Sequence, residues 1–223
     1  MKKLINRILS FDNNKKKSNP NIFKTSGEYW ENRYKKGGNS GAGSYNELAE
    51  FKAKIINYFV QNNNINSVIE FGCGDGNQLK YLQFNKYTGY DVSEKAIEIC
   101  SNLYKDDNTK KFKLMTSYSN EKADLTLSLD VIFHLVEDQV FFNYMNNLFQ
   151  ASKKYIIIYS SNTDNNESSA IHVKHRRFTD WIEKNQKSYK LLNFIPNKYS
   201  FDGDESKTSF ADFYVYEKIG HFS

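Results

Sequence analysis

The feature that most constrains the fold is a glycine-rich turn, GCGDG at residues 72–76, directly after the short apolar segment SVIEF at 67–71. Glycines at alternate positions let the backbone turn tightly and let a ligand lie against the main chain. The apolar segment indicates a buried strand, and residues 77–84 indicate a short helix. Because ligands of open parallel sheets bind beyond the carboxyl ends of the strands, we expect a ligand site at this turn.

Strand-like and helix-like segments alternate along the rest of the chain. The segments typical of strands are 67–71, 87–92, 111–116, 123–131, 154–160, 189–195 and 209–218, and those typical of helices are 27–36, 45–62, 77–84, 94–104, 137–150 and 178–185. This order predicts an α/β fold of three layers, with a mostly parallel seven-stranded sheet between helices. No helical pattern separates the last two strands, so they are expected to pair antiparallel.

Three helix starts carry capping residues. Ser44 and Glu47 form the S-x-x-E pattern of a capping box before the helix at 45–62. Ser93 precedes the helix at 94–104, and Thr179 is expected to cap the helix at 178–185.

Composition and charge limit the protein classes. Of 223 residues, 31 are basic and 26 acidic, and the net charge of +5 is too modest to indicate nucleic-acid binding by itself. Two cysteines cannot form a disulfide scaffold, and no segment is apolar enough to span a bilayer, so a cytoplasmic protein is expected. Residues 1–26 are expected to form a flexible arm, or alternatively a membrane-surface or partner-docking helix, and 27–223 a single domain.

Two acids frame the glycine turn. Glu70 lies in the first strand, and Asp91 ends the second strand about 20 residues downstream, where a carboxylate accepts hydrogen bonds from ribose hydroxyls. The spacing E-x-G-x-G-x-G differs from the dinucleotide fingerprint G-x-G-x-x-G. NAD and a glycine turn without a ligand remain the alternatives.

Together with ADLTLSLDVIFHL at 123–135, these residues resemble the class I (Rossmann-like) S-adenosylmethionine-dependent methyltransferases over about 27–217. The resemblance implies a three-layer Rossmann-like methyltransferase fold that uses S-adenosyl-L-methionine and releases S-adenosyl-L-homocysteine, with no metal. The cofactor-binding residues that it implies are Arg33, Glu70, Gly72, Cys73, Gly74, Asp91, Val92, Thr116, Ser117, Ser128, Leu129 and Asp130.

By this resemblance, Glu70 orients the methionine end of the cofactor, Asp91 binds the ribose and Val92 lies against the adenine. The segment MTSYSN at 115–120 lacks the acid that often contacts the adenine amino group, so Thr116, Ser117 or a backbone group is expected to replace it. Residues 37–44 are expected to form a cofactor lid or a flexible connector. Arg33 is expected to pair with the methionine carboxylate or to be a surface charge.

The acceptor side is expected to contain His134 after the fourth strand, as a general base or as a histidine packed under the cofactor. The basic segment IHVKHRRF at 171–178 has four interpretations: an anion clamp, a solvated turn, a nucleic-acid patch or a metal site. As an anion clamp it would provide Arg176 and Arg177, with His172 and His175 as further candidate bases. The remaining expected substrate contacts are Tyr159 and Asn162.

Three segments, HLVED at 134–138, IIIYSSN at 156–162 and HVKHRRFTDWI at 172–182, are similar to small-molecule methyltransferases of bacterial surface-glycan pathways. This resemblance implies O-methylation of a small anionic acceptor, such as a sugar, a nucleotide-linked sugar or a phosphoryl group, in surface polysaccharide biosynthesis. The segment SLDVIF at 128–133 lacks the N/D-P-P-Y motif of many enzymes that methylate amides. The alternatives are an RNA or protein methyltransferase and a non-catalytic cofactor-binding module.

Overall fold

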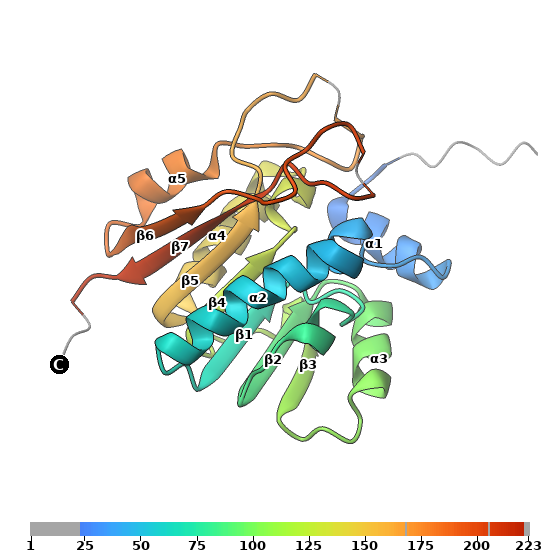
Figure 1. Cartoon of the computed structure of the whole chain (residues 1–223). Helices are drawn as coiled ribbons and strands as arrows, with labels where there is room; N and C mark the ends of the chain where they lie inside the picture. The colour runs from blue at the N-terminus through green and yellow to red at the C-terminus, as the bar shows by residue number, and fades with distance from the viewer. Residues whose placement is uncertain (1–22, 168, 205, 221–223) are drawn as a thin grey trace, which may run out of the picture.

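The computed structural model describes residues 23–167, 169–204 and 206–220, so nearly all of the expected N-terminal arm lies outside the described residues. A seven-stranded sheet forms the centre of the molecule, in the order β3-β2-β1-β4-β5-β7-β6 (Figure 1). Its strands are β1 (Ser67–Phe71), β2 (Lys86–Asp91), β3 (Lys110–Leu114), β4 (Ala123–Leu129), β5 (Ser152–Ser160), β6 (Tyr189–Ile195) and β7 (Asp212–Lys218). Strands β1 to β5 pair in parallel, and β7 runs antiparallel to both β5 and β6. The predicted fold class is confirmed.

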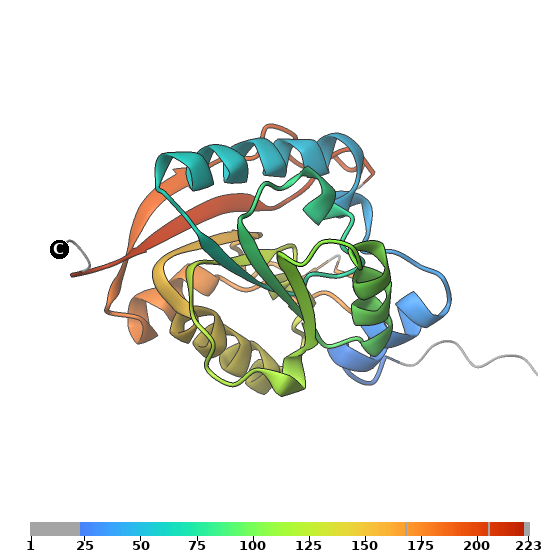
Figure 2. The same ribbon diagram turned by 90° about the horizontal axis from the view of Figure 1, so that it is seen from below.

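Helices cover both faces of the sheet. They are α1 (Ser26–Lys35), α2 (Asn46–Asn62), α3 (Glu94–Leu103), α4 (Asp138–Gln150) and α5 (Phe178–Asn185). Seen along the sheet, α2 lies on one face, and α4 and α5 lie on the other (Figure 2). Helix α1 contacts α3 at the edge where the parallel strands end. The sheet is therefore the middle layer of three.

The central strands are apolar throughout because both of their faces are covered. In β5, Ile157 faces the core under α2, whereas Ile156 and Ile158 face the core under α4 and α5. All three side chains are fully buried. Burial of each such side chain stabilises the folded state by roughly 1.5–3 kcal/mol, so the central strands form a firmly packed base for the site at their carboxyl ends.

One of the three predicted caps is confirmed and two are wrong. Ser93 Oγ accepts a hydrogen bond from the Ala96 amide at 3.0 Å and caps α3. Ser44 ends a short 3-10 turn (Ala42–Ser44), and α2 begins only at Asn46, after Tyr45. Thr179 lies inside the first turn of α5, and its hydroxyl bonds to Asn162.

Two predicted elements are shorter than expected by three residues or more. Residues 77–84 form only a 3-10 turn (Gln78–Tyr81). The last strand begins at Asp212 and not at residue 209, because the preceding residues turn back and the Ser209 amide bonds to the Tyr199 carbonyl. In the part of the chain that the structure describes, no helix has the length and apolarity to cross a bilayer.

Candidate active site

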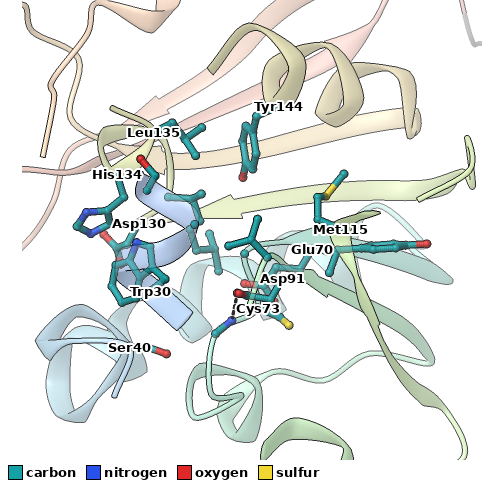
Figure 3. Close-up of a pocket in the computed structure, with 18 of the residues that line it drawn as sticks. Trp30, Ser40, Glu70, Cys73, Asp91, Met115, Asp130, His134, Leu135 and Tyr144 are labelled. Carbon is teal, nitrogen blue, oxygen red and sulfur yellow. Dashed lines mark hydrogen bonds between the residues drawn. The ribbon is translucent and has the colours of Figure 1, made fainter. Parts of the chain in front are cut away.

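A cavity opens at the carboxyl ends of β1, β2 and β4, beneath α1 and the loop that follows it (Figure 3). Its empty space, including the open mouth, is about 870 Å³. The residues that matter most for its chemistry are Ser26, Trp30, Tyr34, Ser40, Glu70, Gly72, Cys73, Gly74, Gln78, Asp91, Val92, Met115, Leu129, Asp130, His134, Leu135 and Tyr144.

The glycine turn forms the floor of this cavity, and a side chain at two of its glycines would be strained and would displace neighbouring side chains. Gly72 and Gly74 have φ values of +86° and +56°. A Cβ atom at Gly72 would lie 2.4 Å from Val131 Cγ2, and one at Gly74 would lie 2.3 Å from Ser40 Oγ. The turn therefore brings bare backbone to the cavity surface, as a ligand lying along the main chain requires.

Asp91 joins the end of β2 to the glycine turn. Its Oδ2 accepts a hydrogen bond from the Gly74 amide at 2.9 Å, and its Oδ1 accepts one from the Ser93 amide at 2.9 Å. Burial raises the pKa of this carboxyl to about 6, although the backbone amides oppose the rise. Asp91 lines the cavity, where its remaining lone pairs can accept ligand hydroxyls.

Glu70 is the second buried acid on the cavity wall. Its Oε2 accepts a hydrogen bond from the Tyr87 hydroxyl at 2.6 Å. Burial raises the pKa of Glu70 to about 7, and the charge of Lys52 partly offsets this rise. A cation bound in the cavity would favour the ionised carboxylate, so Glu70 suits the positively charged end of a ligand.

The loop after α1 closes over the glycine turn. The Ser40 amide donates to Asp75 Oδ2 at 2.9 Å, and the Asp75 amide donates to Ser40 Oγ at 2.9 Å. The Tyr45 hydroxyl also donates to Asp75, at 2.7 Å, and the Tyr34 hydroxyl lies 2.9 Å from Ser40 Oγ. Of the two interpretations of residues 37–44, this geometry supports the lid. The sequence analysis missed Ser40 and Asp75, although Asp75 stands inside the glycine turn.

Arg33 lies outside the cavity lining. Its Nε donates to the Asn39 carbonyl at 2.6 Å, and its guanidinium lies over the Trp30 ring at 5.4 Å. These contacts tie Arg33 to the loop after α1 and to Trp30, so the structure favours the alternative expectation for Arg33, a charge outside the cofactor pocket.

Of the other expected cofactor residues, Cys73, Val92 and Leu129 line the cavity, and three do not. Thr116 and Ser117 are exposed on the 3-10 turn (Met115–Ser117), and Met115 lines the cavity instead. Ser128 is fully buried, and its hydroxyl accepts a hydrogen bond from the Tyr144 hydroxyl at 2.7 Å. Met115 offers a flexible apolar surface on which an aromatic base can lie.

Asp130 stands at the end of β4 in a left-handed conformation, with φ +58°. Its Oδ2 lies 2.5 Å from the ammonium of Lys52, a side chain that is only 1 % exposed. The sequence analysis missed Lys52. A signal was present, because Lys52 lies four residues from both Leu48 and Ile56 and therefore stands within the buried stripe of α2.

His134 lines the cavity, and its edge faces the Trp30 ring, with the centroids 4.8 Å apart. Burial lowers the pKa of His134 to about 3, so the ring is neutral at ordinary pH. Its Nδ1 lies 3.2 Å from the carbonyl of His172. Because a carbonyl only accepts, Nδ1 carries the proton, and Nε2 keeps a lone pair that can accept a hydrogen bond.

The segment at 171–178 is held by the protein itself. Arg176 donates to the carbonyls of Leu135 and Val136 at 2.5 and 2.8 Å and pairs with Asp138 at 2.8 Å. Its guanidinium therefore braces the turn before α4, contrary to the expectation that it clamps an acceptor. Arg177 is exposed and lies outside the cavity lining.

The two histidines of this segment also lie outside the cavity lining. His172 stacks on Tyr29 with centroids 4.2 Å apart, and His175 Nδ1 lies 2.6 Å from Ser161 Oγ. Within the described ranges, no three histidine, cysteine or acidic side chains are grouped as metal ligands would be. A metal site at this segment has no support among those residues.

The two remaining expected substrate contacts are internal. Tyr159 is 1 % exposed in the core under α2, and its hydroxyl accepts a hydrogen bond from Asn197 at 2.8 Å. Asn162 bonds to Thr179 at the start of α5. Neither side chain lines the cavity, because Tyr159 packs into the core under α2 and Asn162 is directed toward α5.

A parallel sheet, a glycine turn after β1 and an acid ending β2 define a Rossmann-like enzyme that binds an adenosine-type cofactor. The side chains that line the cavity fit S-adenosylmethionine. The carboxylate of Asp91 suits the ribose hydroxyls, the apolar Met115 and Val92 suit the adenine, and Glu70 and Asp130 suit the positively charged methionine end. Residues 44–196 match the family model described as a methyltransferase domain, and the chain belongs to this family.

Solved structures share the fold at low sequence identity. The N-methyltransferase NodS from Bradyrhizobium japonicum WM9, in complex with S-adenosyl-L-homocysteine, is 13 % identical over 88 % of this chain and 100 % of its own, with a TM-score of 0.68. Magnesium protoporphyrin IX methyltransferase (ChlM) from Synechocystis PCC 6803, with S-adenosylmethionine bound, is 13 % identical over 89 % of this chain and 100 % of its own, with a TM-score of 0.60. The methyltransferase domain of bacterial CtHen1 is 19 % identical over 77 % of this chain and 99 % of its own, with a TM-score of 0.59. No curated protein matches the sequence.

Proposed function

We propose that this protein is an S-adenosylmethionine-dependent methyltransferase that O-methylates a small-molecule acceptor. The observation that carries the proposal is a cavity with a glycine floor and Asp91 at one end, and Asp130 and His134 at the other, under a closed lid (Figure 3). Such a cavity suits a cofactor and a small acceptor placed end to end.

The cofactor supplies an electrophilic methyl group on a sulfonium. Methyl transfer would form the oxygen–carbon bond as the carbon–sulfur bond breaks to leave a neutral thioether, and the acceptor proton would be released to solvent, since the pKa of His134 is about 3. The neutral His134 ring can orient the acceptor hydroxyl through Nε2, since Nδ1 is held by the His172 carbonyl. Positioning of the acceptor provides most of the rate in such a displacement.

The proposed acceptor class is a sugar, a nucleotide-linked sugar or a phosphoryl compound of surface polysaccharide biosynthesis. This part rests on the three short segments that resemble surface-glycan methyltransferases. The guanidinium of Arg176 is already bound by groups of the protein. Arg177, which is exposed, is therefore the remaining arginine of this segment that could bind an anionic acceptor. The structurally similar proteins have different names and acceptors, so they do not select among these compounds.

Calorimetric titration with S-adenosyl-L-homocysteine tests cofactor binding, and turnover of S-adenosylmethionine against nucleotide sugars, sugar phosphates and uncharged sugars tests the acceptor class. Binding with turnover of a charged sugar, weakened in Arg177→Ala, supports the proposal. Turnover only with RNA or a protein would assign a macromolecular acceptor. Binding without turnover on any acceptor would indicate a non-catalytic module.

A further inference from the structure

The acidic and basic side chains that line the cavity directly are three acids and a neutral histidine, and the nearest cation, Lys52, lies behind Asp130. Among the described residues that line it are the acids Glu70, Asp91 and Asp130, and no lysine or arginine. If the proposed function holds, two forms of one ligand alternate here. S-adenosylmethionine carries a positive sulfonium, and S-adenosylhomocysteine carries a neutral thioether at the same sulfur. An acidic wall near that sulfur would favour the first form.

Asp130 is the acid best placed for this discrimination. In Figure 3 it lies with Trp30 and His134 at one end of the cavity, away from Met115 and Asp91. If the ribose binds at Asp91, the sulfur and its methyl group are directed toward the Asp130 end. Glu70 and Asp91 are less suitable than Asp130 because Tyr87 already engages one oxygen of Glu70, and the Gly74 and Ser93 amides engage both oxygens of Asp91.

Lys52 fixes the carboxylate of Asp130 from behind. Its ammonium lies 2.5 Å from Oδ2 and 5.2 Å from the centre of the Tyr159 ring, and the side chain is 1 % exposed. The lid packs on the same carboxylate, because a Cβ at Gly43 would lie 2.8 Å from Oδ2. With Oδ2 engaged, Oδ1 is the oxygen left for a ligand.

We propose that Asp130 distinguishes the sulfonium cofactor from its neutral product, and that the buried Lys52 is the positioning residue that holds Asp130 for this purpose. The proposal rests on the proposed methyltransferase function. Loss of the sulfonium charge during transfer removes this attraction, so the neutral product binds less tightly, relative to the cofactor, than it would without Asp130. Lys52 contacts neither ligand and acts through Asp130.

The test compares dissociation constants for S-adenosylmethionine, its stable cationic analogue sinefungin, and S-adenosylhomocysteine, measured by calorimetry at one pH. In Asp130→Asn we expect both cationic ligands to weaken about tenfold relative to S-adenosylhomocysteine, which corresponds to about 1.4 kcal/mol. In Lys52→Met we expect a shift in the same direction, because a buried carboxylate without its partner takes up a proton or turns away.

The double variant Lys52→Met with Asp130→Asn separates positioning from a general structural role. If Lys52 acts through Asp130, the double variant shows the same ligand preference as Asp130→Asn alone. This double variant also leaves no unpaired charge, so it keeps the test valid if Lys52→Met alone is unstable. Thermal unfolding of each variant confirms folding.

The matched control is Lys154→Met, which breaks the Lys154–Asp124 pair at the opposite end of β4 and β5. It should leave the ligand preference unchanged. An unchanged preference in Asp130→Asn, or additive shifts from the two single substitutions, would overturn the proposal. Absence of binding of all three ligands to the unsubstituted protein would instead refute the proposed function.

Discussion

Glu70 makes the stability of the ligand-free protein depend on pH. Its pKa rises from an ordinary 4.5 to about 7, so the folded protein keeps a proton that the unfolded chain releases. The resulting stability is full below pH 4.5 and is lost as the pH rises through 7. When the pH is raised from 4 to 8, we expect the free energy of unfolding of Glu70→Gln to increase by roughly 3 kcal/mol relative to that of the unsubstituted protein. Urea unfolding at both pH values measures this gain, and parallel pH profiles would contradict it.

Asp91 is the residue on which cofactor binding is expected to depend most. Asparagine in its place has a single acceptor oxygen, so it cannot replace both the oxygen that accepts from the Gly74 amide and the one that accepts from the Ser93 amide, and it cannot accept from two ribose hydroxyls as a carboxylate does. We expect Asp91→Asn to weaken S-adenosylhomocysteine binding by roughly 10- to 100-fold, the loss of one to two charge-assisted hydrogen bonds. Calorimetry measures the change. The exposed Asp202→Asn is the control, and equal binding by both variants would refute the role.

His134 is expected to remain neutral across the working pH range. Burial lowers its pKa to about 3, so the ring resonances should not shift between pH 5 and 8. Nuclear magnetic resonance of the histidine side chains, with His134→Gln to assign the signal, measures this directly. A titration midpoint near 6.5 would show that the ring is solvated and would restore it as a general base of ordinary strength.

At the level of elements, the lid is held mainly by polar contacts between Ser40 and Asp75. Ser40→Ala removes the hydroxyl that bonds to the Asp75 amide and to Tyr34, each bond contributing about 0.5–1.5 kcal/mol. We expect amide exchange across 36–45 to become roughly 5- to 30-fold faster, and cofactor dissociation to accelerate with it. Hydrogen exchange with mass spectrometry measures both states. Ser101→Ala, on the exposed side of α3, should change neither.

The elements were predictable where periodicity or glycine spacing determines them. The strands and longer helices followed from apolar patterns, and the turn after β1 followed from Gly72, Gly74 and Gly76. The cap of α2 was not, because Tyr45 takes the N-cap position without a side-chain cap, and its hydroxyl bonds to Asp75, thirty residues away in the sequence. Long-range hydrogen bonds of this kind leave no local trace in the sequence.

The residues of the site were likewise predictable only in part. Glu70 and Asp91 line the cavity as predicted, since strand ends in a parallel sheet meet at one edge. The direction of a long flexible side chain depends on which carbonyls and acids the fold places nearby. Arg33 and Arg176 therefore face Asn39 and the turn before α4, and no spacing rule could have shown this.

For the whole molecule, cofactor binding should be visible as added stability. A ligand at 100 times its dissociation constant stabilises the folded state by about 2.7 kcal/mol. For a chain of this size we expect the melting temperature to rise by roughly 5–10 °C with saturating S-adenosylhomocysteine. Differential scanning calorimetry measures the rise. NAD at equal concentration is the control, and stabilisation by NAD alone would favour the dinucleotide interpretation.

The turn between β4 and α4 connects the two halves of the site. Ser26, at the start of α1, bonds through its amide and hydroxyl to Glu137, and its hydroxyl accepts from the Val136 amide. On the other side, Arg176 holds the carbonyls of Leu135 and Val136. Helix α1, which leads into the lid, and the segment at 171–178 thus share one anchor, so ordering of either favours ordering of the other. Thermodynamic linkage makes any resulting coupling reciprocal: by whatever factor one ligand changes the affinity for a second, the second changes the affinity for the first.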